Sequence, residues 1–459
     1  MKNIKHIYRI LVAATLVLTI GSCTTEDLDP SLEQNKSVED GINSINNISG
    51  LMLGAYEYLT ESGYYGRDYI INNEVRTDNC FSNGNSGRFT TQASFAYNSN
   101  TGYFYDEAYE AIAIANVIIA QDVTTLATDT SELEEGYHIQ GEAYALRALV
   151  HFDLLKQYGQ MNTGGTLGIP YVTEYKGEDL YPSRSTYSEN VTAIMADLQT
   201  AFDMMSDDYY DTTKITMSKY TAKAIESRVA IYFEMWDDAI AASEAVINSG
   251  LYSMVSAENY VSSWSAGSQQ NSIFELAYTS SDNLSSDSIG FIYRLGDSGS
   301  YGDVQVLDDV INIFEPNDVR ADILGYEGTM LRNLYKYPDI NGSDNIPVIR
   351  YEEIILNYAE ALYESTGGGL SELNSLRTNR GLAGLTTITK DAILDERRKE
   401  LMFEGFRFDD LMRTGQDIEK TSLQQNFTST ISYGDFRLAY PIPQNDIDTN
   451  SNLTQNDGY

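Results

Sequence analysis

The chain has 459 residues, of which 67 are acidic and 30 are Lys or Arg, so its formal net charge at pH 7 is -37. Nucleic acids and anionic lipid surfaces repel a polyanion of this strength, which argues against partners of both classes. The hydrophobic share of 42% is that of a globular protein. Two Cys and three His exclude a disulfide framework and argue against a Cys/His zinc site, and we expect no cofactor.

Residues 1–22 have the features of a signal peptide. Three basic residues, Lys2, Lys5 and Arg9, precede an apolar run from Ile10 to Ile20. A helix needs roughly 20 apolar residues to cross a bilayer, so this run is too short to be a membrane span. We therefore predict that the segment is removed and is not part of the fold.

Cys23 stands where a bacterial lipoprotein carries its lipid. The sequence Gly21-Ser22-Cys23 puts two small residues before the cysteine, the pattern that lipoprotein signal peptidase cuts. We predict diacylation of Cys23 and a linker over residues 23–37; a chance cysteine beside an ordinary cleavage site is the alternative. The second cysteine, Cys80, is expected to be a small buried apolar residue.

Apolar residues recur with the helical period in several segments of the body. The clearest sets are Ala145, Leu149 and Phe152; Ile225, Val229, Tyr232 and Trp236; Tyr351, Ile355, Tyr358 and Leu362; and Leu394, Leu401 and Phe408. This spacing predicts a mostly α-helical fold. Small residues in the segment 219–249 make it similar to a degenerate tetratricopeptide helix pair. The long polar stretches 60–103, 160–188, 251–303 and 315–345 are expected to be loop-rich insertions.

Five segments carry a resemblance to one family. They are 142–148 (EAYALRA), 272–276 (SIFEL), 350–362 (RYEEIILNYAEAL), 396–411 (ERRKELMFEGFRFDDL) and the chain end 440–459. Together and in this order they resemble the SusD/RagB family of outer-membrane nutrient-binding lipoproteins of Bacteroidota. The resemblance implies a SusD-like domain over residues 38–459, with an N-terminal half of tetratricopeptide-like helix pairs (38–250) and a C-terminal half (251–459).

The resemblance implies binding without catalysis. A protein of this kind captures an oligosaccharide at the exterior of the outer membrane, where its lipid holds it. It then passes the ligand to a TonB-dependent transporter of the SusC type. Capture of oligopeptides, as in the RagB branch, is an alternative ligand class. A surface glycan-degrading enzyme is the alternative of a different class, because 67 acids leave room for a catalytic carboxylate pair.

Two loops combine aromatic side chains with Asp, Asn and Arg, the mixture that a glycan site needs for stacking and hydrogen bonding. They are 72–105 and 278–303, the regions that carry the ligand surface in the family that the chain resembles. We predict ligand contacts from Arg76, Asp78, Tyr97, Tyr293, Arg294 and Arg350. For Arg350, an ion pair with Glu353 is the alternative. Both tryptophans, Trp236 and Trp264, are expected in the core.

Three further patterns are interpreted as structural. The acids and arginines of the 396–411 motif are expected to clamp neighbouring turns through salt bridges rather than to act as acid and base. Gly296-Asp297-Ser298-Gly299 copies a serine-protease motif, but His138 and His151 are the only histidines of the mature chain. The segment 446–457 imitates a calcium loop that lacks the glycine at its sixth position, and we predict no metal site.

Overall fold

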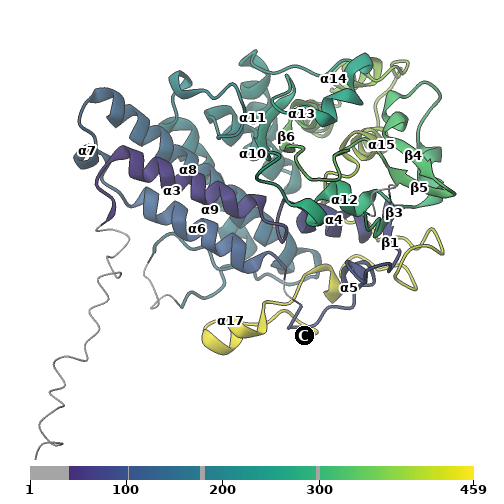
Figure 1. Cartoon of the computed structure of the whole chain (residues 1–459), viewed down its shortest axis with the longest axis horizontal. Helices are drawn as coiled ribbons and strands as arrows, with labels where there is room; N and C mark the ends of the chain where they lie inside the picture. Colours follow the sequence, from purple (N-terminus) through teal and green to yellow (C-terminus); the bar gives the residue numbers. More distant parts are fainter. Residues whose placement is uncertain (1–40, 102, 176–180, 296–299) are drawn as a thin grey trace, which may run out of the picture. The chain divides into compact units, whose positions relative to one another are not determined.

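The computed structural model describes residues 41–101, 103–175, 181–295 and 300–459; the expected signal peptide, Cys23 and the linker lie outside these residues. Ser44–Tyr459 forms one compact unit. This unit is mostly helical with short strands, which confirms the predicted fold class (Figure 1). No helix in the described part of the chain is both long and apolar enough to cross a membrane.

Four long helices of the N-terminal half lie side by side (Figure 1). They are α3 (Ile45–Thr60), α6 (Tyr105–Ile119), α8 (Thr130–Tyr158) and α9 (Tyr187–Met204). Helix α8 contacts the other three, so most side chains of its second half are buried. Local chemistry fixes where these helices start: Asp129 accepts a hydrogen bond from the amide of Glu132 at 2.9 Å, and Thr186 with Glu189 forms a capping box.

The other helices follow in chain order. They are α4 (Asp68–Val75), α5 (Thr90–Ala93), α7 (Val123–Leu126), α10 (Lys219–Tyr232), α11 (Trp236–Asn248), α12 (Ile289–Tyr293), α13 (Tyr351–Thr366), α14 (Leu370–Asn379), α15 (Lys390–Leu401), α16 (Arg407–Arg413) and α17 (Gln444–Thr449). The predicted pair over 219–249 is formed by α10 and α11. The small side chains of Ala230 and Ala239 let these two helices approach closely. Helix α11 also packs on α13, so elements on either side of residue 250 are in contact.

Short strands pair as antiparallel two-stranded sheets within the described residues. They are β1 (Cys80–Ser82) with β3 (Val304–Val306), β2 (Ser272–Leu276) with β6 (Ile346–Arg350), and β4 (Leu324–Glu327) with β5 (Met330–Asn333). The β1–β3 ladder opposes Cys80 to Val306, and Cys80 is fully buried as expected. Trp264 is 6% exposed and belongs to the core, as expected. Trp236 is only partly buried and packs against the edge of the α10–α11 cluster.

The segment that holds Leu394, Leu401 and Phe408 forms two helices, α15 and α16, rather than one. Between them the chain turns sharply, because Phe403 and Gly405 have φ of 69° and 83°. The turn rests on α4: the amide of Gly405 donates to Glu74 Oε1 at 3.0 Å. The left-handed region is open to glycine at little cost, so Gly405 permits a break that apolar periodicity does not show.

Candidate ligand-binding surface

Arg76 and Tyr97, both predicted to contact ligand, lie in the interior. Arg76 follows α4 and is fully buried; its guanidinium donates to Gln157 Oε1 at 2.6 Å and lies 3.6 Å from the centroid of the Phe408 ring. Tyr97 is 8% exposed, and its ring centroid lies 4.4 Å from that of Tyr440. Both side chains therefore support the loop 72–105 from the protein interior.

Asp78 holds the same loop against the motif 396–411. Its carboxylate accepts hydrogen bonds from Arg407 at 2.7 and 2.9 Å and pairs with Arg398 at 3.0 Å. Burial alone would raise the pKa of Asp78, but the two guanidinium charges outweigh it and hold the pKa below its ordinary value. The carboxylate is thus ionised and already engaged by the protein.

Tyr293 and Arg294 stand at the end of α12. Tyr293 is fully buried, with its ring centroid 5.3 Å from that of Phe403, so its removal would open a cavity in the core. Tyr293→Ala would therefore test folding as well as binding. Arg294 is half-buried and pairs with Glu327 of β4 at 3.1 Å.

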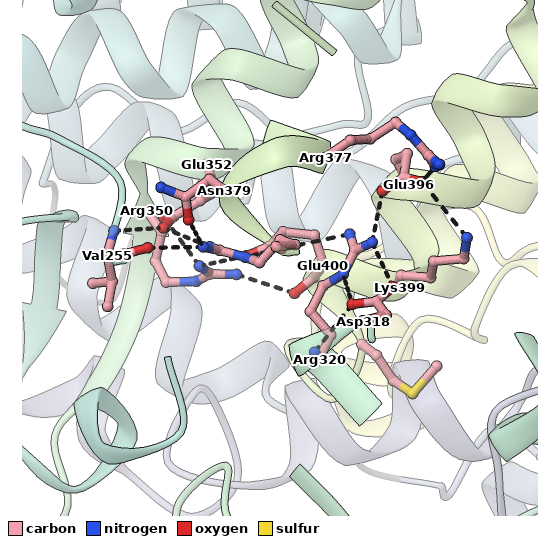
Figure 2. A network of polar contacts seen from close by, with 12 residues as sticks. Val255, Asp318, Arg320, Arg350, Glu352, Arg377, Asn379, Glu396, Lys399 and Glu400 are labelled. Atoms are coloured by element: carbon pink, nitrogen blue, oxygen red, sulfur yellow. Dashed lines mark hydrogen bonds and ion pairs between the residues drawn. The ribbon is translucent and has the colours of Figure 1, made fainter. Parts of the chain in front are cut away.

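Arg350 lies inside a buried ion network (Figure 2). Its guanidinium pairs with Glu352 at 3.1 Å, with Glu400 at 3.2 Å and with Glu404 at 2.7 Å. The alternative partner expected from the sequence, Glu353, is wrong, because Glu353 pairs with Arg228 at 2.6 Å. Arg350 thus ends strand β6 by fastening it to the motif 396–411.

The network continues from Glu400 toward Glu396, as Figure 2 shows. Arg380 pairs with Glu400 at 2.9 Å, and Arg320 pairs with Glu396 at 2.7 Å. Arg377 also pairs with Glu396. These contacts agree with the structural clamp expected for the motif. Ligand contact by the six residues singled out from the sequence stays a prediction. Within the protein, each of their side chains already packs against or pairs with other residues.

The open surface of the two predicted loops is formed by other side chains. Because β1 pairs with β3, the segment after β1 lies beside the segment before β3. Side-chain amides then tie the two together: Asn83 Nδ2 donates to the carbonyl of Gly302 at 2.6 Å, and Asn85 Nδ2 donates to the carbonyl of Tyr301 at 2.8 Å. Loops far apart in the sequence therefore form one surface.

Five side chains form this surface, which we name the Arg88–Tyr301 platform: Arg67, Arg88, Asp287, Phe291 and Tyr301. The Arg88 guanidinium lies 4.5 Å from the centroid of the Tyr301 ring, and Phe291 meets that ring edge-on at 4.9 Å. Asp287 accepts hydrogen bonds from Arg88 at 3.0 Å and from Arg67 at 2.5 Å. The Arg88 and Asp287 side chains are 31% and 43% exposed, so both are partly open to solvent.

The platform combines the groups that an oligosaccharide recognises. Aromatic rings pack against the apolar C–H face of a sugar ring, and a guanidinium and a carboxylate supply donors and acceptors for its hydroxyl groups. Ion pairs and the cation–π contact hold Arg88 and Tyr301 in place before a ligand arrives, which lowers the entropy that binding must remove.

Sequence reasoning singled out the two loops but not the side chains that form their open surface. Arg76 and Tyr293 were chosen because Arg and Tyr are typical of glycan sites, yet both sit at helix ends that face the core. The sequence next to Arg88 did contain a pattern that could have predicted an exposed turn. Gly84 and Gly87 precede it with φ of 73° and 85°, and glycines at that spacing indicate a tight surface turn.

Both histidines of the described residues lie in helix α8 and are buried. Burial lowers the pKa of His138 to about 4 and that of His151 to about 3. His151 Nε2 accepts the amide of Val172 at 3.1 Å, so this ring has a structural partner. Within the described residues no group of three or more His, Cys, Asp or Glu is placed to hold a metal ion. The segment Gly296–Gly299 lies outside the described residues.

Comparisons with known proteins agree with this fold. A family model described as "SusD family" matches residues 326–459, and one described as "Starch-binding associating with outer membrane" matches residues 27–231. A crystal structure of a putative sugar binding protein from Bacteroides vulgatus is 26% identical, with a TM-score of 0.83 over 91% of this chain and 99% of that one. A SusD superfamily protein from Bacteroides thetaiotaomicron is also 26% identical, with a TM-score of 0.82 over 90% and 99%.

Two sequence relatives complete the comparison. The starch-binding protein SusD of Bacteroides thetaiotaomicron is 35% identical over 130 residues, which cover 27% of this chain and 22% of that relative's length. SusD-like protein P38 of Formosa agariphila is 24% identical over 88% of each chain. The fold is thus that of the SusD-like proteins, which this chain shares as a largely helical unit. The chain belongs to the SusD/RagB family.

Proposed function

We propose that the protein binds an oligosaccharide at the exterior of the outer membrane without converting it, and delivers it to a TonB-dependent transporter of the SusC type. The observation that carries the binding step is the Arg88–Tyr301 platform, a partly exposed aromatic and guanidinium surface held in place by β1 and β3. The names of two relatives, a starch-binding protein and a putative sugar binding protein, support a carbohydrate as the ligand.

Binding without chemistry is favoured by how the carboxylates of the platform are used. Asp287 is held by two guanidinium groups, and the neighbouring Asp303 accepts hydrogen bonds from the amide of Ser86 at 3.0 Å and from its hydroxyl at 2.7 Å. Both carboxylates are therefore already engaged by donors of the protein itself. These contacts favour capture of a ligand over its hydrolysis.

Tyr301→Ala tests the binding step. The change removes the ring that Arg88 and Phe291 position, and we expect it to weaken binding of a cognate oligosaccharide by about 1–2 kcal/mol. Isothermal titration calorimetry with maltoheptaose and with a laminarin-derived hexasaccharide measures the effect. Tyr137→Ala is the matched control, because Tyr137 is an exposed tyrosine on α8, outside the platform.

The result has clear alternatives. If Tyr301→Ala and Tyr137→Ala bind a sugar ligand equally well, the platform is not the site. If no sugar binds the wild-type chain but a mixed peptide library does, the ligand class is oligopeptide rather than oligosaccharide. Release of shortened sugars from the bound ligand would show that the protein is an enzyme.

Delivery requires a partner that encloses the captured ligand. A lipid on Cys23 would keep the platform within reach of a transporter in the same membrane, and two proteins that close around one ligand share its contacts. We expect the chain to co-purify with a SusC-type transporter from outer membranes solubilised in mild detergent. Recovery of the chain alone under those conditions would contradict the delivery step.

A further inference from the structure

A second concave surface lies at the N-terminal end of α6, built from residues that the platform does not use. Two hollows with volumes of about 360 and 290 Å³ share Tyr105 and Asp106 in their walls. The first runs along residues 99–100 and 103–107 to α17, and the second runs from α6 to the segments 170–175 and 181–182. Because they share a wall, we treat them as one feature, the α6–α17 cleft.

Tyrosines form the apolar wall of this cleft. Tyr105 and Tyr109 stand one turn apart on α6 with ring centroids 4.8 Å apart, and Tyr109 donates to the carbonyl of Pro170 at 2.9 Å. Tyr175 and Tyr181 also line the cleft and are 44% and 49% exposed. Exposed tyrosines that gather around a hollow provide stacking faces for a ligand, whereas a single one would need no explanation.

Carboxylates form the polar wall. Asp106, Glu107 and Asp446 line the cleft, and none of the three has an ion-pair partner among the described residues. Burial raises the pKa of Asp446, and the charge of Asp106 raises it further. Burial likewise raises the pKa of Glu107. The cleft therefore concentrates negative charge that no cation within the described part of the protein neutralises.

Acidic residues in the first turn of a helix have an ordinary structural role, because they complement the helix dipole. That role accounts for Asp106 and Glu107 but not for Asp446, which comes from α17. Tyr103 also lines the cleft, but its hydroxyl is enclosed by the protein and its ring packs against Tyr440, with centroids 4.6 Å apart.

Arg184 is the basic residue whose charge acts on the tyrosines of this cleft, and it already has hydrogen-bond partners within the protein. Arg184 acts on Tyr105 and Tyr109, but it is only 8% exposed. Its guanidinium donates to the carbonyl of Gly168 at 2.7 Å and to Asn456 Oδ1 at 2.8 Å. No Lys, Arg or His is among the described residues that line either hollow. An anionic ligand would meet only repulsion here, and a ligand rich in cationic donors would find acceptors.

We propose that the α6–α17 cleft is a second ligand site, separate from the Arg88–Tyr301 platform, for an oligosaccharide that carries free amino groups. The tyrosine faces accept the C–H faces of the sugar rings, as in other aromatic glycan contacts. The carboxylates of Asp106 and Asp446 accept the ammonium groups, which are donors only. The site goes beyond the capture of a neutral sugar at the platform and is testable apart from it.

The test compares two ligands with one backbone. One probe is the hexamer of β-1,4-linked glucosamine and the other is its fully N-acetylated form, which has the same rings without the charge. Titration calorimetry is run on the full chain at mildly acidic pH, where the amino groups of the glucosamine hexamer are protonated. We expect the glucosamine hexamer to bind at least about tenfold more tightly than the acetylated hexamer, the scale of one charged hydrogen bond.

Variants assign the binding to the cleft. Asp106→Asn combined with Asp446→Asn should weaken the glucosamine hexamer by at least about tenfold. Tyr181→Ala should weaken both hexamers. Glu134→Gln removes an exposed carboxylate of α8 outside the cleft, and it should change nothing. Tyr301→Ala should also leave this binding unchanged, which separates the cleft from the platform. Melting curves confirm that each variant is folded.

Three results would overturn the proposal. Equal binding of the two hexamers would show that the cleft does not recognise the amino group. Equal binding of hexalysine, with the same losses in the variants, would make the cleft a surface for polycations in general. Loss of glucosamine binding in Tyr301→Ala, with the Asp106 and Asp446 variants unaffected, would place the ligand on the platform. If Tyr301→Ala leaves neutral-sugar binding unchanged while the cleft variants weaken the glucosamine hexamer as expected, only the proposed function is contradicted.

Discussion

Arginine side chains converge on the carboxylate of Glu400, which is fully buried. Arg350 and Arg380 pair with it at 3.2 and 2.9 Å, and Arg320 lies 3.7 Å away. Burial of Glu400 alone would raise its pKa, but the charges of Arg380, Arg350 and Arg320 hold the pKa well below the ordinary value of 4.5. One acid thus holds together segments from the loop 315–345, β6, α14 and α15.

Glu400→Gln should destabilise the protein by about 3–5 kcal/mol, because it leaves buried guanidinium charges without their partner. Glu364→Gln is the control, since Glu364 makes a partly exposed pair with Lys390, worth about 1 kcal/mol or less. Urea unfolding at pH 7 measures both. A Glu400→Gln variant within about 1 kcal/mol of the wild type would contradict the role assigned to the network.

The same substitution has a pH dependence of known sign. A carboxyl group whose pKa is depressed in the folded state contributes stability above its unfolded pKa and loses it as the pH falls toward the folded value. The unfolding free energies of wild type and Glu400→Gln should therefore differ fully above pH 4.5 and converge as the pH falls below it. A difference that grows in acid would have the wrong sign.

At the scale of elements, the turn between α15 and α16 decides how the motif 396–411 meets α4. Gly405 has φ of 83°, and a Cβ added there would lie 3.1 Å from the Cα of Ile70. Two requirements coincide at this glycine: a left-handed backbone and a close approach to another helix. The turn brings Arg398 and Arg407, which flank it, to the carboxylate of Asp78.

Gly405→Ala separates these two requirements when it is compared with Gly415→Ala. Gly415 has φ of 65° with nothing within 4 Å of an added Cβ, so alanine there suffers only the left-handed backbone, about 1–2 kcal/mol. Gly405→Ala should cost at least about 1 kcal/mol more, from overpacking against α4. Thermal unfolding measures both variants. Equal losses would show that the contact with Ile70 adjusts without cost.

Much of the element order was predictable, because helical periodicity reports burial along one face. The set on α8 shows this most clearly, because all three of its residues are buried. On α10, Ile225, Val229 and Tyr232 are buried, whereas Ile355 is the one buried member of the set on α13. The α15–α16 break was not predictable, because it depends on contact between Gly405 and α4, far away in the sequence. The platform was missed for the same reason. The side chain of Arg88 meets Tyr301 only after β1 and β3 have paired.

At the scale of the whole molecule, charge shapes how the protein can stay at a membrane. Removal of residues 1–22 takes away three basic residues and no acids, so the formal charge falls from -37 to -40. Anionic lipid attracts polybasic segments and repels a chain of this kind. Retention at the membrane would therefore rest on a covalent lipid and on protein partners, without help from surface charge.

Cys23→Ala should release the protein from the membrane fraction and abolish labelling with radioactive palmitate, because the thiol of Cys23 is the predicted acceptor of the diacylglyceryl unit. Cys80→Ala is the matched control: this thiol is fully buried in β1, and its loss should leave labelling unchanged. Fractionation and labelling of whole cells measure both variants. Label that persists in Cys23→Ala would place the lipid on another residue.

The ladder between β1 and β3 also bears on how related proteins diverge. It joins the two platform loops largely through main-chain atoms, such as the hydrogen bond from the amide of Asn83 to the carbonyl of Asp303 at 2.9 Å. Main-chain contacts survive a change of side chain, so outer-face residues other than the tying Asn83 and Asn85 can be exchanged one by one while the loops stay together. Ligand preference can then drift within a lineage without loss of the fold, as suits a chain only 26% identical to a structure it matches with a TM-score of 0.83.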